Sequence, residues 1–260
     1  MAKVIAIINQ KGGVGKTTNA VNLSALLGAM GQRVLMIDLD PQGNTTSGLG
    51  MEVDDKSIYE VIMGRMKLTD VMEETEFKNL SIAGSDVRLA NAELELVEVE
   101  KREYRLKTAV QSVQQDFDFI FIDCPPSLGL LTINALGAAD SVLIPIQCEY
   151  YALEGVASLM NTISRVKKTI NPHLEIEGVL LTMLDGRTNL GLQVVDEVKK
   201  HFKKQVYATV IPRSVRLGEA PSHGEPIHVY DKRSAGCVAY VNLAKEVLKR
   251  NNIKVKEFKL

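Results

Sequence analysis

The stretch from residue 9 to residue 18, Asn-Gln-Lys-Gly-Gly-Val-Gly-Lys-Thr-Thr, has the composition of a loop that binds phosphate. Glycines let several backbone amides point into one concavity, and a helix that follows the loop adds its positive N-terminal end. Lys16 can reach the β- and γ-phosphates of a nucleotide, and the Thr17 hydroxyl can hold Mg²⁺. The residues expected to bind the nucleotide are Lys11, Gly12, Gly13, Val14, Gly15, Lys16, Thr17 and Thr18.

The loop departs from the usual phosphate-binding motif at Gln10, where that motif has glycine. It fits a more specific variant, Lys-Gly-Gly-x-Gly-Lys-Thr, which adds Lys11 at its start. Phosphate cradling within one chain leaves little use for this second lysine. Lys11 therefore indicates a cation that is delivered to the nucleotide of another molecule. A purely structural turn would be a costly use of three glycines, because each loses backbone entropy on folding.

Carboxylates follow two apolar runs farther along the chain. Asp38 and Asp40 are two residues apart, so in an extended chain they point to opposite sides. One of them can face the γ-phosphate, where an acid positions a water or takes up its proton, while the other organises the site. Asp123 ends an apolar run and is expected to hold Mg²⁺ through a water. The loop at 127–129 could sense the γ-phosphate.

Apolar runs that alternate with helical stretches must position these groups. We expect a helix over residues 19–30 and strands over residues 4–8, 33–37, 80–83, 119–122, 141–146, 178–183 and 207–211. Continuous apolar strands with helices between them predict an α/β fold with a mostly parallel, twisted sheet and helices on both faces. Ligands of such sheets bind at the carboxyl ends of the strands, where the polar residues gather. No linker or repeat is evident, which predicts one domain over residues 1–260.

The net charge of −1 hides an asymmetry between the two halves of the chain. Residues 1–150 carry 13 Lys/Arg and 21 Asp/Glu, whereas residues 151–260 carry 18 and 11. The basic half could face nucleic acid, although solvated helix faces would give the same composition. The Glu-rich stretch 89–107 is expected to be an exposed amphipathic helix. No apolar run approaches a bilayer-spanning length and no signal-peptide pattern is present. Cys124, Cys148 and Cys237 are odd in number and far apart, which is typical of reduced thiols, so we expect a cytoplasmic protein.

Four stretches together resemble the ParA/Soj chromosome- and plasmid-partitioning ATPases. They are the loop at 11–17, Asp-Leu-Asp-Pro-Gln-Gly-Asn at 38–44, Ile-Asp-Cys-Pro-Pro-Ser at 122–127 and Pro-Arg-Ser-Val-Arg-Leu-Gly-Glu-Ala-Pro-Ser at 212–222. The stretch 147–155 is also similar to the family, and the likeness runs from about residue 3 to about residue 250 in the same order. This group of P-loop NTPases, with a deviant Walker motif, also contains MinD and the nitrogenase iron protein.

The resemblance implies a cycle driven by ATP and Mg²⁺. ATP would close a homodimer in which Lys11 reaches the partner's phosphates and Gly12 lies at the close interface. Lys11, Lys16 and Asp40 would be catalytic, with Asp40 positioning or activating water. Thr17, Asp40 and Asp123 are the candidate residues around the metal. The dimer would bind double-stranded DNA without sequence preference, and a ParB-like centromere-binding protein would trigger hydrolysis. Such a protein is expected in the cytoplasm, associated with the nucleoid.

Candidates for the DNA-binding face lie in the basic half. Arg187 and Arg216 match positions that the family is thought to use. Clustered basic residues on two helices are further candidates, although a solvated face explains each lysine as well. They are Lys199, Lys200, Lys203 and Lys204 on one helix and its end, and Lys245, Lys249 and Arg250 on the last helix. Asp185, or the backbone near Pro212 and Arg213, is expected to meet the adenine.

Three other functions remain as alternatives. A MinD-like membrane ATPase shares the phosphate motifs, but the tail 251–260 alternates apolar and basic residues with a period nearer two than 3.6, which suits an interfacial helix poorly. A protein like the nitrogenase iron protein would need two cysteines per chain at the dimer face. Cys124 lies too close to the metal-binding acid for that role. A positioning ATPase for another cargo would differ only in its partner.

Overall fold

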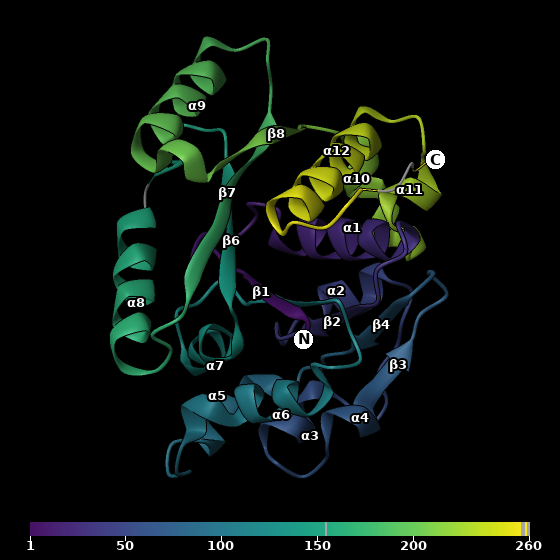
Figure 1. Ribbon diagram of the computed structural model, residues 1–260, viewed down its shortest axis with the longest axis vertical. Coiled ribbons are helices and arrows are strands. Elements are labelled where there is room, and N and C mark those ends of the chain that lie inside the picture. Colours follow the sequence, from purple (N-terminus) through teal and green to yellow (C-terminus); the bar gives the residue numbers. More distant parts are fainter. Residues whose placement is uncertain (154, 256–257, 259–260) are drawn as a thin grey trace.

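A twisted sheet of eight strands forms the centre of the computed structural model, which describes all residues except 154, 256, 257, 259 and 260 (Figure 1). The strand order is β3-β4-β2-β5-β1-β6-β7-β8. All neighbouring strands run parallel except β3, which pairs antiparallel with β4 at one edge. The predicted α/β class with a mostly parallel sheet is therefore confirmed. The strands are β1 (Lys3–Ile7), β2 (Val34–Asp38), β3 (Met72–Glu74), β4 (Leu80–Ala83), β5 (Phe119–Asp123), β6 (Ser141–Gln147), β7 (Glu175–Leu184) and β8 (Val206–Pro212).

Helices connect the strands and cover the sheet. The α-helices are α1 (Lys16–Ala29), α2 (Asn44–Gly48), α3 (Ile58–Ile62), α4 (Leu68–Val71), α5 (Leu89–Glu95), α6 (Arg105–Val113), α7 (Leu130–Ala138), α8 (Val156–Thr169), α9 (Asn189–Phe202), α10 (Val215–Glu219), α11 (Ile227–Tyr230) and α12 (Ala235–Arg250). Three short 3₁₀ turns are η1 (Arg102–Tyr104), η2 (Lys203–Gln205) and η3 (Ala220–His223).

The two faces of the sheet have separate apolar cores. Val4 and Ala6 of β1 point into a core shared with α3 to α9, whereas Ile5 and Ile7 point into a core shared with α1 and α12. Figure 1 shows α1 and α12 together on one side, with α7 and α8 on the other. Because both faces are covered, every residue of the central strand β5 is buried. This burial is why the central strands appear in the sequence as continuous apolar runs.

Strand register brings the predicted acids together. Asp123, the last residue of β5, pairs with Ile7 of β1 on one side and with Asp38 of β2 on the other. The loop after β1 therefore leaves the sheet beside both carboxylates. The carboxyl ends of β1, β2 and β5 form one edge, as the parallel arrangement predicts.

One expected helix was wrong and one strand was missed. The stretch 89–107 is not one exposed helix, because α5 ends at Glu95 and α6 begins at Arg105. Lys101, between them, adopts a left-handed conformation with φ of 53°, which no helix can continue through. Leu89, within this stretch, is fully buried. The strand β3 was also missed, since its three residues are too short and too acidic to give a strand pattern.

Part of the expected tail pattern lies on residues 256, 257, 259 and 260, which are outside the described residues. Glu154 of the stretch 147–155 is outside them as well. Among the helices that the structure describes, none combines the length and apolar character needed to cross a membrane.

Candidate functional site

Two left-handed glycines shape the loop between β1 and α1. Gly13 has φ of 73°, and Gly15, which caps the N-terminus of α1, has φ of 91°. Side chains disfavour this region, so glycine is required at both positions. The sharp turn at Gly15 lets α1 begin at Lys16, three residues before the predicted start. The first amides of α1 therefore belong to the loop, together with the positive end of the helix.

The loop is an open cradle. A Cβ atom built at Gly12 or at Gly13 has no other atom of the described chain within 4 Å. Gly12 also has no positive φ, so nothing within the described chain requires glycine there. The space in front of Gly12 is thus open to a ligand or to a second molecule.

Two polar side chains fix this cradle to the sheet. Asn9 donates from Nδ2 to the Pro145 carbonyl of β6 over 2.7 Å, and its Oδ1 accepts from the Lys11 amide over 3.0 Å. Thr182 of β7 donates its hydroxyl to the Val14 carbonyl over 2.9 Å. Sequence reasoning missed both roles, because the partners are distant in the chain. The loop geometry is therefore set by strands on the far side of β1.

Asn19 attaches the base of the loop to the last helix. Its Nδ2 donates to the Gly15 carbonyl over 2.7 Å, and its Oδ1 accepts from the Tyr240 hydroxyl of α12 over 2.8 Å. All of these groups are buried or partly buried, where unsatisfied polar atoms are costly. Asn19 and Tyr240 are thus supporting residues that carried no recognisable signal in the sequence.

Lys16 lies inside the cradle. Its Nζ donates to the Lys11 carbonyl over 3.2 Å, and its side chain is almost fully buried. Burial lowers the pKa of Lys16, while the nearby charges of Asp123 and Asp40 oppose the shift. A buried cation at this point suits an anionic ligand, which would supply the missing charge.

Asp123 joins the loop to the segment after β2. Its Oδ2 accepts hydrogen bonds from the Thr17 hydroxyl over 2.8 Å and from the Thr45 hydroxyl over 2.7 Å. Its other oxygen, Oδ1, is buried and has no hydrogen-bond partner. A buried carboxylate oxygen without a partner is costly, and it fits a metal-bound water as the missing partner. Thr45 was missed, although it directly follows the recognised stretch 38–44.

Burial is the main reason why the pKa values of Asp123 and Asp38 are raised. It raises the pKa of Asp123 to about 7, and the adjacent charge of Asp38 adds to the shift. The hydroxyls of Thr45 and Thr17 and the charge of Lys16 oppose it. Burial likewise raises the pKa of Asp38 to about 6. A cation near this pair would favour both charged forms.

Asp38 and Asp40 differ in their surroundings. Asp38 is fully buried and accepts from the Thr46 amide over 2.9 Å and the Thr46 hydroxyl over 2.7 Å, so it holds the start of α2 in place. Asp40 accepts from the Gln42 amide over 3.1 Å and keeps a small exposed surface. Asp38 therefore organises the segment, and Asp40 is the acid that keeps some exposure and whose charge acts on Lys16 in the cradle.

Lys11 does not point into its own cradle. Its Nζ forms an ion pair with Glu149, just beyond the end of β6, and both side chains are partly exposed. Glu149 lies in the stretch 147–155, which the sequence singled out without giving this residue a role. An exposed pair of this kind is weak and can exchange partners readily.

The two arginines proposed for DNA contact already have acidic partners. Arg187, 88% exposed, pairs with Asp185 over 2.7 Å. This pairing holds the pKa of Asp185 well below its usual range and occupies the carboxylate expected near adenine. Arg216 pairs with Glu219 over 2.8 Å and with Asp231 over 3.5 Å. All these contacts are at the surface, where phosphate could replace the carboxylates.

Most of the lysine candidates are solvent-exposed, including Lys249 of α12, but Lys245 of the same helix is half-buried and Arg250 is not free. Those on α9 and η2 are Lys199, Lys200, Lys203 and Lys204. Arg250 instead stacks over the Tyr207 ring at 3.9 Å and donates to the Val206 carbonyl over 2.9 Å. Arg250 therefore links α12 to β8, and its role is structural.

Pro212 and Arg213 lie at the carboxyl end of β8. Pro212 pairs with Leu184 at the end of β7, and the Arg213 amide donates to the Leu184 carbonyl over 3.1 Å. This is the same edge of the sheet as the cradle. Their expected contact with adenine stays a prediction.

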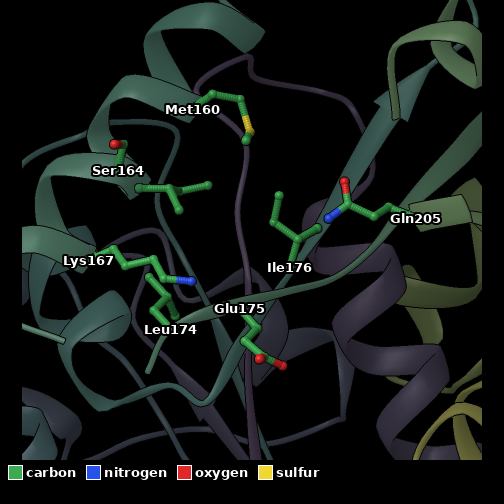
Figure 2. A pocket seen from close by; sticks show the side chains of 8 residues that line it. Met160, Ser164, Lys167, Leu174, Glu175, Ile176 and Gln205 are labelled. Atoms are coloured by element: carbon green, nitrogen blue, oxygen red, sulfur yellow. The ribbon is translucent and has the colours of Figure 1, made fainter. Parts of the chain in front are cut away.

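A separate hollow lies between α8 and the start of β7 (Figure 2). Met160 and Lys167 of α8 line one side, with Leu174 beside Lys167, and Ile176 and Gln205 lie across from them. It opens at the amino end of β7, opposite to the edge that carries the cradle. It therefore belongs to no part of the proposed nucleotide site.

Comparison with known proteins agrees with these features. A family model described as an AAA domain matches residues 2–176. The chain is 59% identical over 249 residues to the sporulation initiation inhibitor protein Soj of Bacillus subtilis, covering 95% of this chain and 98% of that protein. It is 50% identical over 256 residues to the chromosome partitioning protein ParA of Myxococcus xanthus, covering 98% and 90%.

A solved structure shows the same fold. The cobyrinic acid a,c-diamide synthase of Mycobacterium smegmatis, with bound ATP analogue and magnesium, is 36% identical and superposes with a TM-score of 0.85 over 100% of both chains. Its ligands show that a fold of this kind can hold such a nucleotide and Mg²⁺ together.

Proposed function

Because the chain belongs to the ParA/Soj family of chromosome-partitioning ATPases, we propose that it is a Mg²⁺-dependent ATP switch for DNA segregation. As a single domain over residues 1–260, it would hydrolyse ATP to ADP and phosphate. ATP binding would close a homodimer that binds double-stranded DNA without sequence preference, and hydrolysis would release it. The protein would act in the cytoplasm, on the nucleoid.

One observation carries the proposal. One oxygen of Asp123 accepts hydrogen bonds from the Thr17 and Thr45 hydroxyls. The other oxygen is buried and unpaired beneath the glycine cradle. When bound, Mg²⁺ would neutralise charge on the phosphates. Thr17 would then turn its hydroxyl toward the metal, and Asp123 would hold a metal-bound water. Thr45 would keep its hydrogen bond to Asp123, which ties the segment after β2 to the same carboxylate.

The cradle residues have distinct tasks in this proposal. The amides of Gly12 to Thr18 bind the phosphates, and Lys16 supplies a positive charge that burial has already separated from water. Asp40 positions the attacking water or takes up its proton. Pro212 and Arg213 close over the base.

Lys11 would contact the nucleotide of a second copy of the chain. To reach the partner's phosphates it must leave Glu149, and the exposed ion pair makes this exchange inexpensive. The open space in front of Gly12 would receive the partner. Since these contacts exist only in the dimer, ATP can bias the monomer–dimer equilibrium through them.

DNA binding would follow from dimerisation. Two copies double the number of basic groups that face one duplex, and affinity then rises through release of counterions. Arg187, Arg216 and the lysines of α9 and η2 are the proposed contacts. A ParB-like centromere-binding protein would stimulate hydrolysis and end the bound state.

The deciding experiment measures binding to random-sequence duplex DNA with ATP, with ADP and without nucleotide. We expect binding with ATP alone, weakening steeply as salt rises. Asp40→Ala should bind ATP and DNA but hydrolyse ATP at least about a hundredfold more slowly, because it loses the group that positions or deprotonates water. Its DNA-bound state should therefore last longer than that of the native chain.

Two controls make the result specific. Equal DNA binding in all three nucleotide states would rule out the switch. Anionic vesicles replace DNA in a parallel assay, and ATP-dependent binding to vesicles but not to DNA would favour a membrane-positioning ATPase instead.

A further inference from the structure

Met183, near the carboxyl end of β7, has a backbone conformation that methionine rarely adopts. Its φ is 53°, in the left-handed region that disfavours residues with a side chain. Such a conformation costs free energy, and it persists only where the surrounding structure enforces it. Strained residues of this kind gather at functional sites, so the contacts around Met183 indicate what the strain maintains.

The pairing of β7 with β8 is irregular at the same point. Leu181 of β7 pairs with Val210 of β8. The next pair joins Leu184 to Pro212, so β7 advances by three residues where β8 advances by two. An extra residue of this kind is a β-bulge, a feature that redirects side chains and is frequent beside active sites. Met183 therefore lies inside a bulge at the edge of the sheet that carries the cradle.

The bulge directs two consecutive side chains of β7 onto the phosphate loop. The Thr182 hydroxyl donates to the Val14 carbonyl over 2.9 Å. A Cβ atom built at Gly15 would lie 3.8 Å from Met183 Cε, so the end of the Met183 side chain packs against this turn. In a regular strand, neighbouring side chains point to opposite faces. The left-handed conformation of Met183 thus brings a second residue of β7 to the loop.

Gly15 is the point at which the loop needs support from other side chains. With a φ of 91° and no side chain of its own, it resists movement poorly. The Asn19 side chain supplies one contact, because its Nδ2 donates to the Gly15 carbonyl over 2.7 Å. Met183 supplies a second contact, from the sheet. Since α1 begins at the next residue, a shift of Gly15 would move the amides that face the phosphates.

The residues on both sides of Met183 are fixed to neighbouring strands. The Thr182 carbonyl accepts from the amide of Cys148, which follows β6, over 2.9 Å. The Leu184 carbonyl accepts from the amide of Arg213, which follows β8, over 3.1 Å. These two hydrogen bonds hold the chain before and after Met183, and they can thus maintain its costly conformation.

We propose that Met183 is a positioning residue of the nucleotide site, which holds Gly15 and thereby keeps the amides of the loop arranged for phosphate. The inference rests on the proposed function and adds a residue of β7 on which nucleotide binding depends. Methionine suits this task, because its unbranched side chain reaches Gly15 and adds no charge that would compete for phosphate. Because Met183 acts through the loop, its effect extends to any ligand that carries the phosphates, with or without a base.

The test compares Met183→Ala and Met183→Leu in the full chain, with Met160→Ala as the matched control. Met160 is also a partly buried methionine, but it lines the hollow in Figure 2, away from the cradle. A fluorescent ADP analogue is titrated in the presence of Mg²⁺, and inorganic pyrophosphate then competes with it.

Met183→Ala should raise the dissociation constants of both ligands about tenfold, because the loop is no longer held in the arrangement that binds phosphate. Met183→Leu should stay within about threefold of the native values, since leucine has a similar volume. The control at Met160 should stay within about twofold, because its side chain contacts no part of the loop.

A further variant, Met183→Gly, separates the strain from the packing. It removes the same contact as alanine does, but glycine adopts a φ of 53° without strain. This variant should unfold at a higher urea concentration than Met183→Ala and should bind both ligands just as weakly. A glycine variant that is no more stable than the alanine variant would contradict the strained conformation, and the inference with it.

The remaining outcomes distinguish the inference from the proposed function. If Met183→Ala is less stable but binds both ligands like the native chain, the side chain serves only the core, and the inference fails while the proposed function stands. If ADP binding weakens and pyrophosphate binding does not, Met183 contacts the nucleoside instead of acting through Gly15, and the inference is also overturned. A native chain that binds neither ligand would remove the proposed nucleotide site itself.

Discussion

At the scale of single residues, one carboxylate joins three parts of the site. Asp123 holds hydroxyls from the phosphate loop and from the segment after β2, and its backbone belongs to the central strand. Its burial makes it sensitive to any cation nearby, because no water can screen the charge. Thr17 and Thr45 both donate to the same oxygen of Asp123, so this carboxylate connects the phosphate loop with the segment after β2.

The pKa of Asp123 leads to a prediction about protons. With a pKa of about 7, this carboxyl is about half protonated in the free protein at neutral pH, whereas the state with Mg²⁺ favours the charged form. Binding of Mg-ATP should therefore release about half a proton at pH 7, and affinity should rise with pH between about 6 and 8. Calorimetry in two buffers of different ionisation enthalpy measures the release. Asp123→Asn should lose most of it, and proton uptake by the native chain would contradict the assignment.

At the scale of elements, α1 follows the phosphate loop and must pack closely against the sheet to keep the loop in position. Its last turn meets the turn before β4, where Asn79 adopts a left-handed conformation and donates to the Gly28 carbonyl over 3.2 Å. A Cβ at Gly28 would lie 2.4 Å from the Lys78 carbonyl oxygen. Glycine is therefore required here by close packing inside a helix that would otherwise prefer alanine.

Gly28→Ala should destabilise the protein in spite of the better helix propensity of alanine. We expect a loss of about 1–3 kcal/mol in the free energy of unfolding, because the helix must move away from a backbone oxygen. Urea denaturation measures the change. Gly218→Ala in α10 is the matched control, since a Cβ there meets no atom of the described chain within 4 Å. It should be neutral or stabilising by up to about 1 kcal/mol, and equal effects of the two changes would refute the packing argument.

At the scale of the whole molecule, charge is separated along the sheet. The basic half of the sequence supplies β7 and β8 with α8 and α9, and it also supplies α10, α11 and α12, which lie near α1 (Figure 1). The acidic half supplies the strands from β3 to β6 in the sheet order. A chain with a net charge of −1 can thus present a basic region to DNA.

Salt dependence of DNA binding tests which residues make up that region. Each phosphate contact contributes about 0.9 to the slope of log affinity against log salt, so loss of one arginine from both copies should lower the slope by about two. We expect this for Arg187→Ala and Arg216→Ala, with ATP binding unchanged. Lys168→Ala, an exposed change on α8, is the control and should leave the slope as it is. Loss of ATP binding together with DNA binding would point to misfolding and remove the assignment.

The sequence by itself determined the phosphate loop, the acids at the strand ends and the class of the fold. These features are local, since glycine spacing, apolar runs and the residue after each run are all read within a few positions. The start of α1 was misplaced because left-handed Gly15 allows the helix to begin inside the loop. The stretch 89–107 was misread because its apolar residues fall on two faces, which a single amphipathic pattern does not describe.

Only the tertiary structure decided which distant groups meet. The contacts of Thr45 with Asp123, Thr182 with Val14 and Lys11 with Glu149 each join residues far apart in the chain. No local pattern encodes them, because they depend on strand order and register. The same is true of Arg250, whose charge suggested DNA and whose surroundings bind it to Tyr207. Local chemistry specified the parts of this site, and long-range packing, which minimises buried unpaired polar groups, specified how they are joined.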